Sequence, residues 1–154
     1  MIATVHLLAG ATLATKNPNV FLGLFLAFVS HYFLDFIPHI EYISSSKANP
    51  DEIKKNLAAD SVKVAADFLI GGLILLFISK NKSLAFLGGF LAILPDFDNI
   101  FLFFPKLLKF KLFKIIFNFH LKVHFFSNKK IPVFVRILSQ VLVILISIYF
   151  LRLQ

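Results

Sequence analysis

The chain has 154 residues and a net charge of +8, and 58% of its side chains are hydrophobic, with 21 phenylalanines among them. This apolar share, with a mean hydropathy of +0.85, excludes an ordinary soluble domain, in which roughly 45 to 50% of residues are apolar. Because cysteine is absent, disulfides and thiolate metal ligands are excluded, and any bound metal must use His, Asp, Glu or Asn.

Apolar segments of helical length follow one another and predict an all-α polytopic membrane protein that forms a single domain over residues 1–154. We expect about five membrane-embedded helices, at 2–15, 20–37, 60–78, 83–94 and 131–151. A polar loop is expected at 41–59, in which Asn49-Pro50-Asp51-Glu52 can start a short helix. The first segment lacks a basic leader and contains His6, so we expect it to remain in the mature protein.

Residues 105–126 alternate lysines with Leu, Ile and Phe, which is typical of a basic amphipathic helix in the headgroup layer. We expect this interfacial helix to bind anionic lipid rather than cross the bilayer. Each lysine at the bilayer centre would cost about 2.5 to 3.5 kcal/mol.

Lysine and arginine are unequally distributed between the two predicted faces. The 40–63 and 105–136 segments hold most of them, and the opposite face has only Lys16, Lys80, Lys82 and Arg152. The positive-inside rule therefore predicts that the N-terminus and the basic segments are cytoplasmic. Membrane lipids, and not nucleic acid, are the expected partners.

The end of the second predicted helix carries His31, Asp35 and His39 at four-residue spacing, which places them on one face. Two imidazoles and a carboxylate suit a divalent ion such as zinc, although such residues can also simply meet water at a helix end. All the histidines and several aspartates lie toward the predicted cytoplasmic face. We expect one to three ions, with ligands among His6, His31, Asp35, His39, Asp67, Asp96, Asp98, His120 and His124.

The two predicted helix pairs have similar sequences. When residues 21–31 are aligned with residues 86–96, His31 falls on Asp96, and the helices before them align as well. We therefore predict a two-helix internal repeat, in which a pseudo-twofold axis along the membrane normal would bring the polar positions together. The repeat units are about 2–39 and 63–100, and they pair His6 with Asp67.

Four motifs carry a resemblance to a known family: an early His before a small-residue helix, His-x3-Asp-x2-Pro-His, Leu-Pro-Asp-x-Asp and a late His-x3-His pair. Together they resemble the YdjM-like family of membrane-bound metal-dependent hydrolases, which is distantly similar to the all-helical, zinc-dependent bacterial phospholipases C. The resemblance implies a zinc-type site, phosphoester hydrolysis and a location in a prokaryotic inner membrane. The chain lacks both the His-Arg-Gly-x-Thr-His stretch of many members and the N-terminal Trp ligand of the phospholipases, so the metal number and substrate stay open.

We expect metal-dependent hydrolysis of a phosphoester, in a lipid or lipid-linked substrate, because the predicted site lies at headgroup depth. The sequence has neither a Gly-x-Ser-x-Gly motif nor a Gly-rich phosphate loop. Asp98 and Asp35 are the candidate catalytic carboxylates, able to orient or deprotonate water. The alternatives are a divalent-cation transporter, a metal-binding membrane module without hydrolytic activity, and a protein whose metal only joins helices.

Overall fold

A computed structural model of the chain describes residues 1–40, 50–99, 105–123 and 131–153. These residues form helices and no strand, so the all-α prediction is confirmed. The helices are α1 (Ala3–Lys16), α2 (Val20–Phe36), α3 (Pro50–Ile78), α4 (Lys82–Ile93), α6 (Lys111–Val123) and α7 (Val133–Arg152), with short 3-10 helices η1 (Leu94–Asn99) and η2 (Pro105–Lys109).

Local sequence explains where several helices begin. The side chains of Asn19 and Asn81 accept hydrogen bonds from the backbone of the first turns of α2 and α4, at 3.1 and 3.2 Å. Pro50 opens α3, since proline has no amide hydrogen to lose in a first helical turn. The helix start expected within Asn49-Pro50-Asp51-Glu52 is confirmed. The loop expected after it, up to residue 59, is wrong, because this helix is not short but continues without a break to Ile78.

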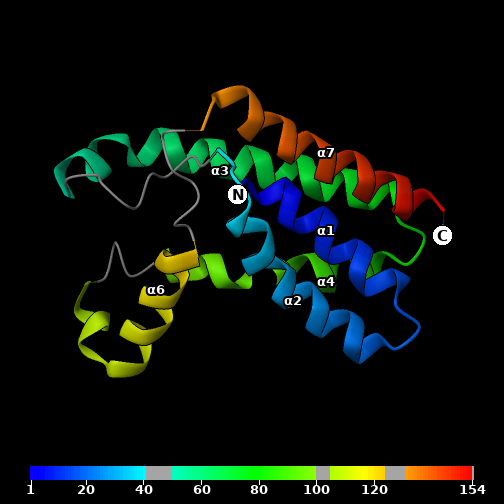
Figure 1. The fold of residues 1–154 in the computed structure, drawn as a ribbon, viewed down its shortest axis with the longest axis horizontal. Coiled ribbons are helices and arrows are strands. Elements are labelled where there is room, and N and C mark those ends of the chain that lie inside the picture. Colours follow the sequence, from blue (N-terminus) through cyan, green and yellow to red (C-terminus); the bar gives the residue numbers. More distant parts are fainter. Residues whose placement is uncertain (41–49, 100–104, 124–130, 154) are drawn as a thin grey trace.

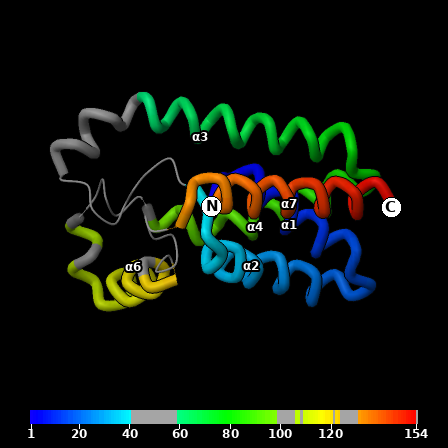
Figure 2. Tube along the Cα trace, turned by 45° about the horizontal axis from the view of Figure 1, so that its top comes forward, coloured from blue at the N-terminus to red at the C-terminus, as the bar shows by residue number. Residues whose placement is uncertain are grey.

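Helix α1 lies at the centre of the bundle and contacts α2, α3, α4 and α7 (Figures 1 and 2). Its buried side chains include Val5, Leu7 and Leu8, which form the apolar core together with Leu75 of α3. Helix α3 contacts chiefly α1, whereas α2 packs against both α1 and α4. The internal repeat stays a prediction.

Helices α1 and α4 run antiparallel with their backbones in contact. A Cβ atom on Gly88 would overlap Ala14 and the carbonyl oxygen of Gly10, and one on Gly10 would overlap Ala92. Small residues allow apolar helices to approach this closely. The crossing brings the end of α4, and η1 after it, beside the start of α1.

Gly88→Ala is expected to destabilise the protein by about 1 to 3 kcal/mol, because the added methyl group overlaps backbone atoms that cannot move independently. Gly72→Ala is the matched control. A Cβ there meets only an atom of Phe86 at 3.9 Å, and alanine favours a helix interior. Thermal melts in detergent should show a lower melting temperature for the first variant alone. Equal melting temperatures would contradict the close crossing.

Two helical segments are long and apolar enough to cross a membrane, Ala59–Ile78 and Val133–Arg152. The expected five membrane-embedded helices are not confirmed. Helices α1, α2 and α4 have 14, 17 and 12 residues. At about 1.5 Å per residue, each is shorter than the roughly 30 Å hydrocarbon core.

Candidate metal centre

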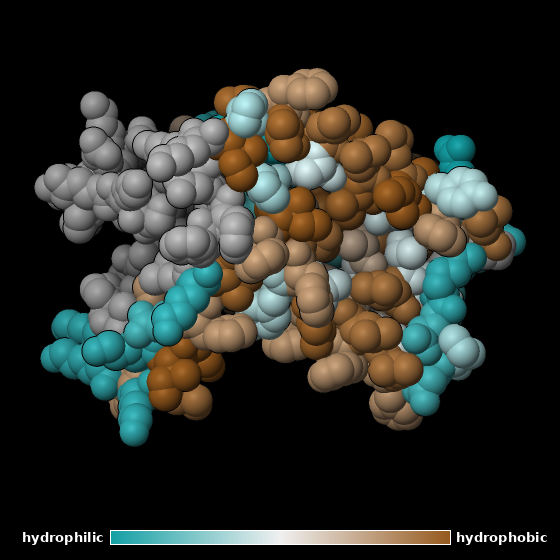
Figure 3. Space-filling view, in the orientation of Figure 1, coloured by the Kyte–Doolittle hydropathy of each residue, from teal (hydrophilic) through white to brown (hydrophobic). Residues whose placement is uncertain are grey.

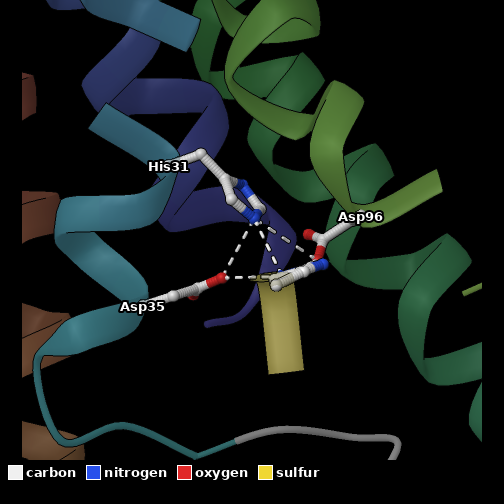
Figure 4. Close-up of side chains that lie close together, drawn as sticks. His31, Asp35 and Asp96 are labelled. Atoms are coloured by element: carbon white, nitrogen blue, oxygen red, sulfur yellow. Dashed lines mark hydrogen bonds and ion pairs between the residues drawn. The ribbon is translucent and has the colours of Figure 1, made fainter. Parts of the chain in front are cut away.

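Four side chains from three segments converge near the start of α1. His31 and Asp35 lie on the last turns of α2, Asp96 lies on η1, and His120 lies near the end of α6. One ligand atom from each lies within 4.8 Å of the other three, and we call these four residues the ligand cluster. Figure 4 shows His31, Asp35 and Asp96 pointing toward one another.

The ligand cluster is enclosed on most sides. His31 and Asp35 are fully buried, and His120 is 5% exposed. The side chain of Asp96 is 27% exposed, so its side of the cluster is the open one. Buried ionisable groups are costly unless they are paired or bind a cation. Asp35 Oδ1 pairs with the N-terminal ammonium group of Met1, so a bound cation would offset negative charge on the other side of the carboxylate, between Asp35 Oδ2 and Asp96.

The distances between ligand atoms suit one tetrahedral ion. His31 Nε2 lies 3.0 Å from Asp35 Oδ2 and 3.8 Å from Asp96 Oδ1. His120 Nε2 lies 3.3 Å from His31 Nε2, 3.4 Å from Asp35 Oδ2 and 3.9 Å from Asp96 Oδ1. Ligands at about 2.0 to 2.2 Å from a tetrahedral zinc ion lie about 3.3 to 3.6 Å apart. The donor set is therefore suited to a divalent metal ion.

The other ring nitrogens of the two histidines have partners that fix their tautomers. His31 Nδ1 donates to the carbonyl oxygen of Ala92 at 2.7 Å, and His120 Nδ1 donates to Asp98 Oδ2 at 2.8 Å. Metal-binding histidines commonly make this second hydrogen bond. In the neutral rings the two Nε2 lone pairs then face each other, and they repel unless a proton or a metal ion lies between them.

The negative charge around His120 favours the protonated imidazole when no ion is bound. Burial lowers the pKa of its imidazole, but hydrogen bonds to Asp35 and Asp98 and the negative charge of Asp98 and Asp96 outweigh burial and raise the pKa to about 9. A metal ion binds the neutral ring, so it has to displace this proton at neutral pH.

A second group of histidines surrounds the other oxygen of Asp35. His6 Nε2 lies 3.1 Å from Asp35 Oδ1, and His39 Nε2 lies 3.9 Å from it. His39 Nδ1 donates to the carbonyl oxygen of Ile37 at 2.6 Å, which again leaves Nε2 as the acceptor. His6 is fully buried, and its Nδ1 atom has no hydrogen-bond partner within the described part of the chain. Asp35 thus presents one oxygen to each pair of histidines, and its Oδ1 atom also accepts a hydrogen bond from the buried N-terminal ammonium group of Met1.

The remaining predicted residues lie elsewhere. Asp67 accepts hydrogen bonds from the amide nitrogen and the hydroxyl group of Thr4, at 3.1 and 2.6 Å, so it caps the first turn of α1 instead of joining the ligand cluster. Asp98 lies behind His120 and is not among the four ligand atoms. His124 lies outside the described residues.

Two functional partners were missed by sequence reasoning. The carbonyl oxygen of Ala92 orients His31, and no side-chain pattern reveals a backbone acceptor. Thr4 holds Asp67, and its position two residues before His6 in the first turn of a helix was the available signal.

Comparison with known proteins identifies no relative of this chain. No protein-family model matches the chain, and neither a curated protein nor a solved structure matches it significantly. The resemblance to the YdjM-like family therefore stays a prediction from four short motifs.

Proposed function

We propose that the chain is an integral membrane protein whose ligand cluster binds a divalent metal ion, with zinc as the leading candidate, and hydrolyses a phosphoester. The observation that carries the proposal is the convergence of two oriented imidazoles and two carboxylates within 4.8 Å. A lipid or lipid-linked substrate at the cytoplasmic interface is the favoured class.

The surface of the bundle supports a membrane location. Only 17% and 11% of the two candidate membrane segments are buried, whereas the core helix of a soluble protein would be mostly buried. Figure 3 shows hydrophobic side chains across the middle of the molecule and hydrophilic ones toward both ends. This distribution suits a slab of hydrocarbon between two aqueous faces.

Hydrolysis at the interface and transport across the bilayer place different demands on the depth of the ligand cluster. Ser139 donates to the carbonyl oxygen of Pro38 at 2.6 Å, and Gln140 donates to that of Ile40 at 3.2 Å. These contacts fix the end of α2 beside α7 only six or seven residues, or about 10 Å, from the start of α7. Since half of the hydrocarbon core is about 15 Å thick, that level lies between the headgroups and the midplane, where transport sites lie, so measured turnover, and not depth, separates hydrolysis from transport.

The proposed ion and the side chains around it have different chemical roles. A divalent ion supplies a Lewis acid that lowers the pKa of bound water and offsets charge on a phosphoryl oxygen. His31, His120 and Asp35 would hold the ion on the buried side, and Asp98 keeps the His120 ring in place. The exposed side of Asp96 is where we expect a phosphate group to approach.

A second ion would lie beside the first, where His6, His39 and Asp35 would hold it. It would have to take the place of the N-terminal ammonium group of Met1, which pairs with Asp35 Oδ1. Two-ion sites of this kind bind both the attacking and the leaving oxygen of a phosphoester.

The test is to purify the protein without chelators and to measure its metal content and its hydrolysis of phosphodiester and lipid-phosphate substrates. We expect at least one divalent ion per chain and turnover that a chelator abolishes and zinc restores. Bound metal without turnover of any substrate would support a metal that only joins helices. Absence of bound metal after zinc is supplied would reject the centre itself.

A further inference from the structure

Helix α6 presents three different faces. Successive residues of an α-helix are rotated by about 100°, which separates its side chains into distinct stripes. One stripe is apolar and exposed, at Leu112 (64%), Ile115 (55%), Ile116 (41%) and Phe119 (54%). The next stripe is polar and exposed, at Lys111, Lys114, Asn118 and Lys122. His120 is buried on the third side, within the ligand cluster.

The last turn of α6 attaches it to the bundle. His120 contacts Asp98 at 2.8 Å and Asp35 at 3.4 Å, and the ring centroids of Phe119 and Tyr32 are 5.3 Å apart. Within the described residues, α6 packs chiefly against η2, η1 and α2. Figures 1 and 2 show the rest of α6 standing away from the bundle, at the end where the ligand cluster lies. The position of His120 thus depends on the position of the whole helix.

The exposed stripes fit an anionic bilayer surface. Four apolar side chains adjoin three lysines, and residues 105–123 contain no acidic side chain that would repel lipid phosphates. An amphipathic helix with this arrangement binds in the interface plane, with its apolar face at the acyl boundary and its lysines among the headgroups.

We propose that anionic lipid bound by α6 holds His120 in the ligand cluster, so that lipid binding and metal binding are coupled. The coupling rests on the proposed metal centre and adds its regulation by the membrane surface. When α6 lies on anionic lipid, the fourth ligand is in place before the ion binds. Because linkage is reciprocal, anionic lipid strengthens metal binding by the same factor as metal strengthens the binding of α6 to lipid.

The test compares zinc affinity of the full-length protein in nanodiscs of phosphatidylcholine alone and of equal parts phosphatidylcholine and phosphatidylglycerol. A competing chromophoric chelator reports the affinity. We expect zinc to bind about tenfold more tightly in the anionic discs, a typical size for such coupling. The triple variant Lys111→Gln, Lys114→Gln, Lys122→Gln should bind zinc equally in both discs, with the affinity that the parent has in phosphatidylcholine.

The matched control removes the same number of charges from the other end of the bundle, with Lys16→Gln, Lys80→Gln and Lys82→Gln, and should keep the tenfold lipid dependence. A second readout places a fluorophore at Ile115→Cys, where brominated lipid should quench it more strongly in anionic discs. Zinc binding without lipid dependence in the parent would overturn the coupling alone. Failure to bind zinc in either disc would overturn the metal centre and the coupling together.

Discussion

Asp35→Asn should remove zinc binding almost completely and lower the stability of the metal-free protein as well. Asp35 is fully buried, and its two oxygens face different imidazoles, with Oδ2 3.0 Å from His31 and Oδ1 3.1 Å from His6. An asparagine has nearly the same shape but no negative charge. We therefore expect zinc affinity to fall by more than the roughly 10- to 100-fold that an outer hydrogen-bond partner of a ligand contributes.

The stability loss has a separate cause. Without the charge of Asp35, the buried ammonium group of Met1 and a protonated His120 each lose a partner, and breaking a buried ion pair typically costs about 3 to 5 kcal/mol. Melting temperatures with and without zinc, together with metal stoichiometry, measure both effects. Zinc should raise the melting temperature of the parent, because a ligand stabilises the state that binds it, but not that of the variant.

Asp60→Asn is the control for this experiment. Asp60 lies on α3 and pairs with Lys63 at 2.9 Å, away from the ligand cluster, and the pair is partly exposed to solvent. Partly exposed ion pairs contribute little to stability, so this variant should resemble the parent in stoichiometry and in its response to zinc. An Asp35→Asn protein that keeps the zinc content of the parent would show that the ligand cluster is not where the metal binds.

Local spacing predicted the part of the site that one helix makes. His31 and Asp35 are four residues apart on α2, and the structure brings their side chains to 3.0 Å. The alignment of His31 with Asp96 also anticipated their proximity, at 3.8 Å, although the repeat itself is untested. His120 was a candidate because all the histidines lie toward one predicted face, a pattern that no single helix creates.

Contacts between helices determine which partner a buried aspartate has, and the sequence alone did not predict those contacts. A buried aspartate in an apolar helix needs a partner, and the sequence does not distinguish a metal ion from the unpaired amides at the start of another helix. Asp67 meets Thr4 of α1 because α3 packs beside that first turn. Likewise, apolar composition predicted more membrane-embedded helices than helix length supports, since composition does not show where a short helix ends.

Asp98→Asn is expected to weaken zinc binding by about 10- to 100-fold, measured above the pH at which His120 loses its proton, while all four ligands remain, because Asp98 orients His120 through its Nδ1 atom. Sequence reasoning made Asp98 a candidate for activating water, a role that would leave the metal content unchanged. Its position behind the imidazole predicts the opposite result. Asp98 is a positioning residue in this arrangement.

The pH profile of zinc affinity separates positioning from a general loss of stability. In the parent, zinc displaces a proton from His120, whose pKa is about 9. The apparent affinity should therefore rise by about tenfold per pH unit up to that pH for this one proton, and then level off. In Asp98→Asn one hydrogen bond and one negative charge that raise this pKa are lost, so the affinity should level off at a lower pH.

Zinc titrations of the parent, Asp98→Asn and the Asp60→Asn control, from neutral pH to above pH 9, measure this difference. The control should follow the parent at every pH, because its carboxylate lies outside the ligand cluster. If Asp98→Asn binds zinc more weakly but with the same levelling pH as the parent, the carboxylate does not act through His120. If Asp98→Asn shows both weaker binding and a lower levelling pH, the carboxylate acts through His120. A group that faces the imidazole affects both the pKa of the proton that zinc displaces and the orientation of the ring that binds zinc.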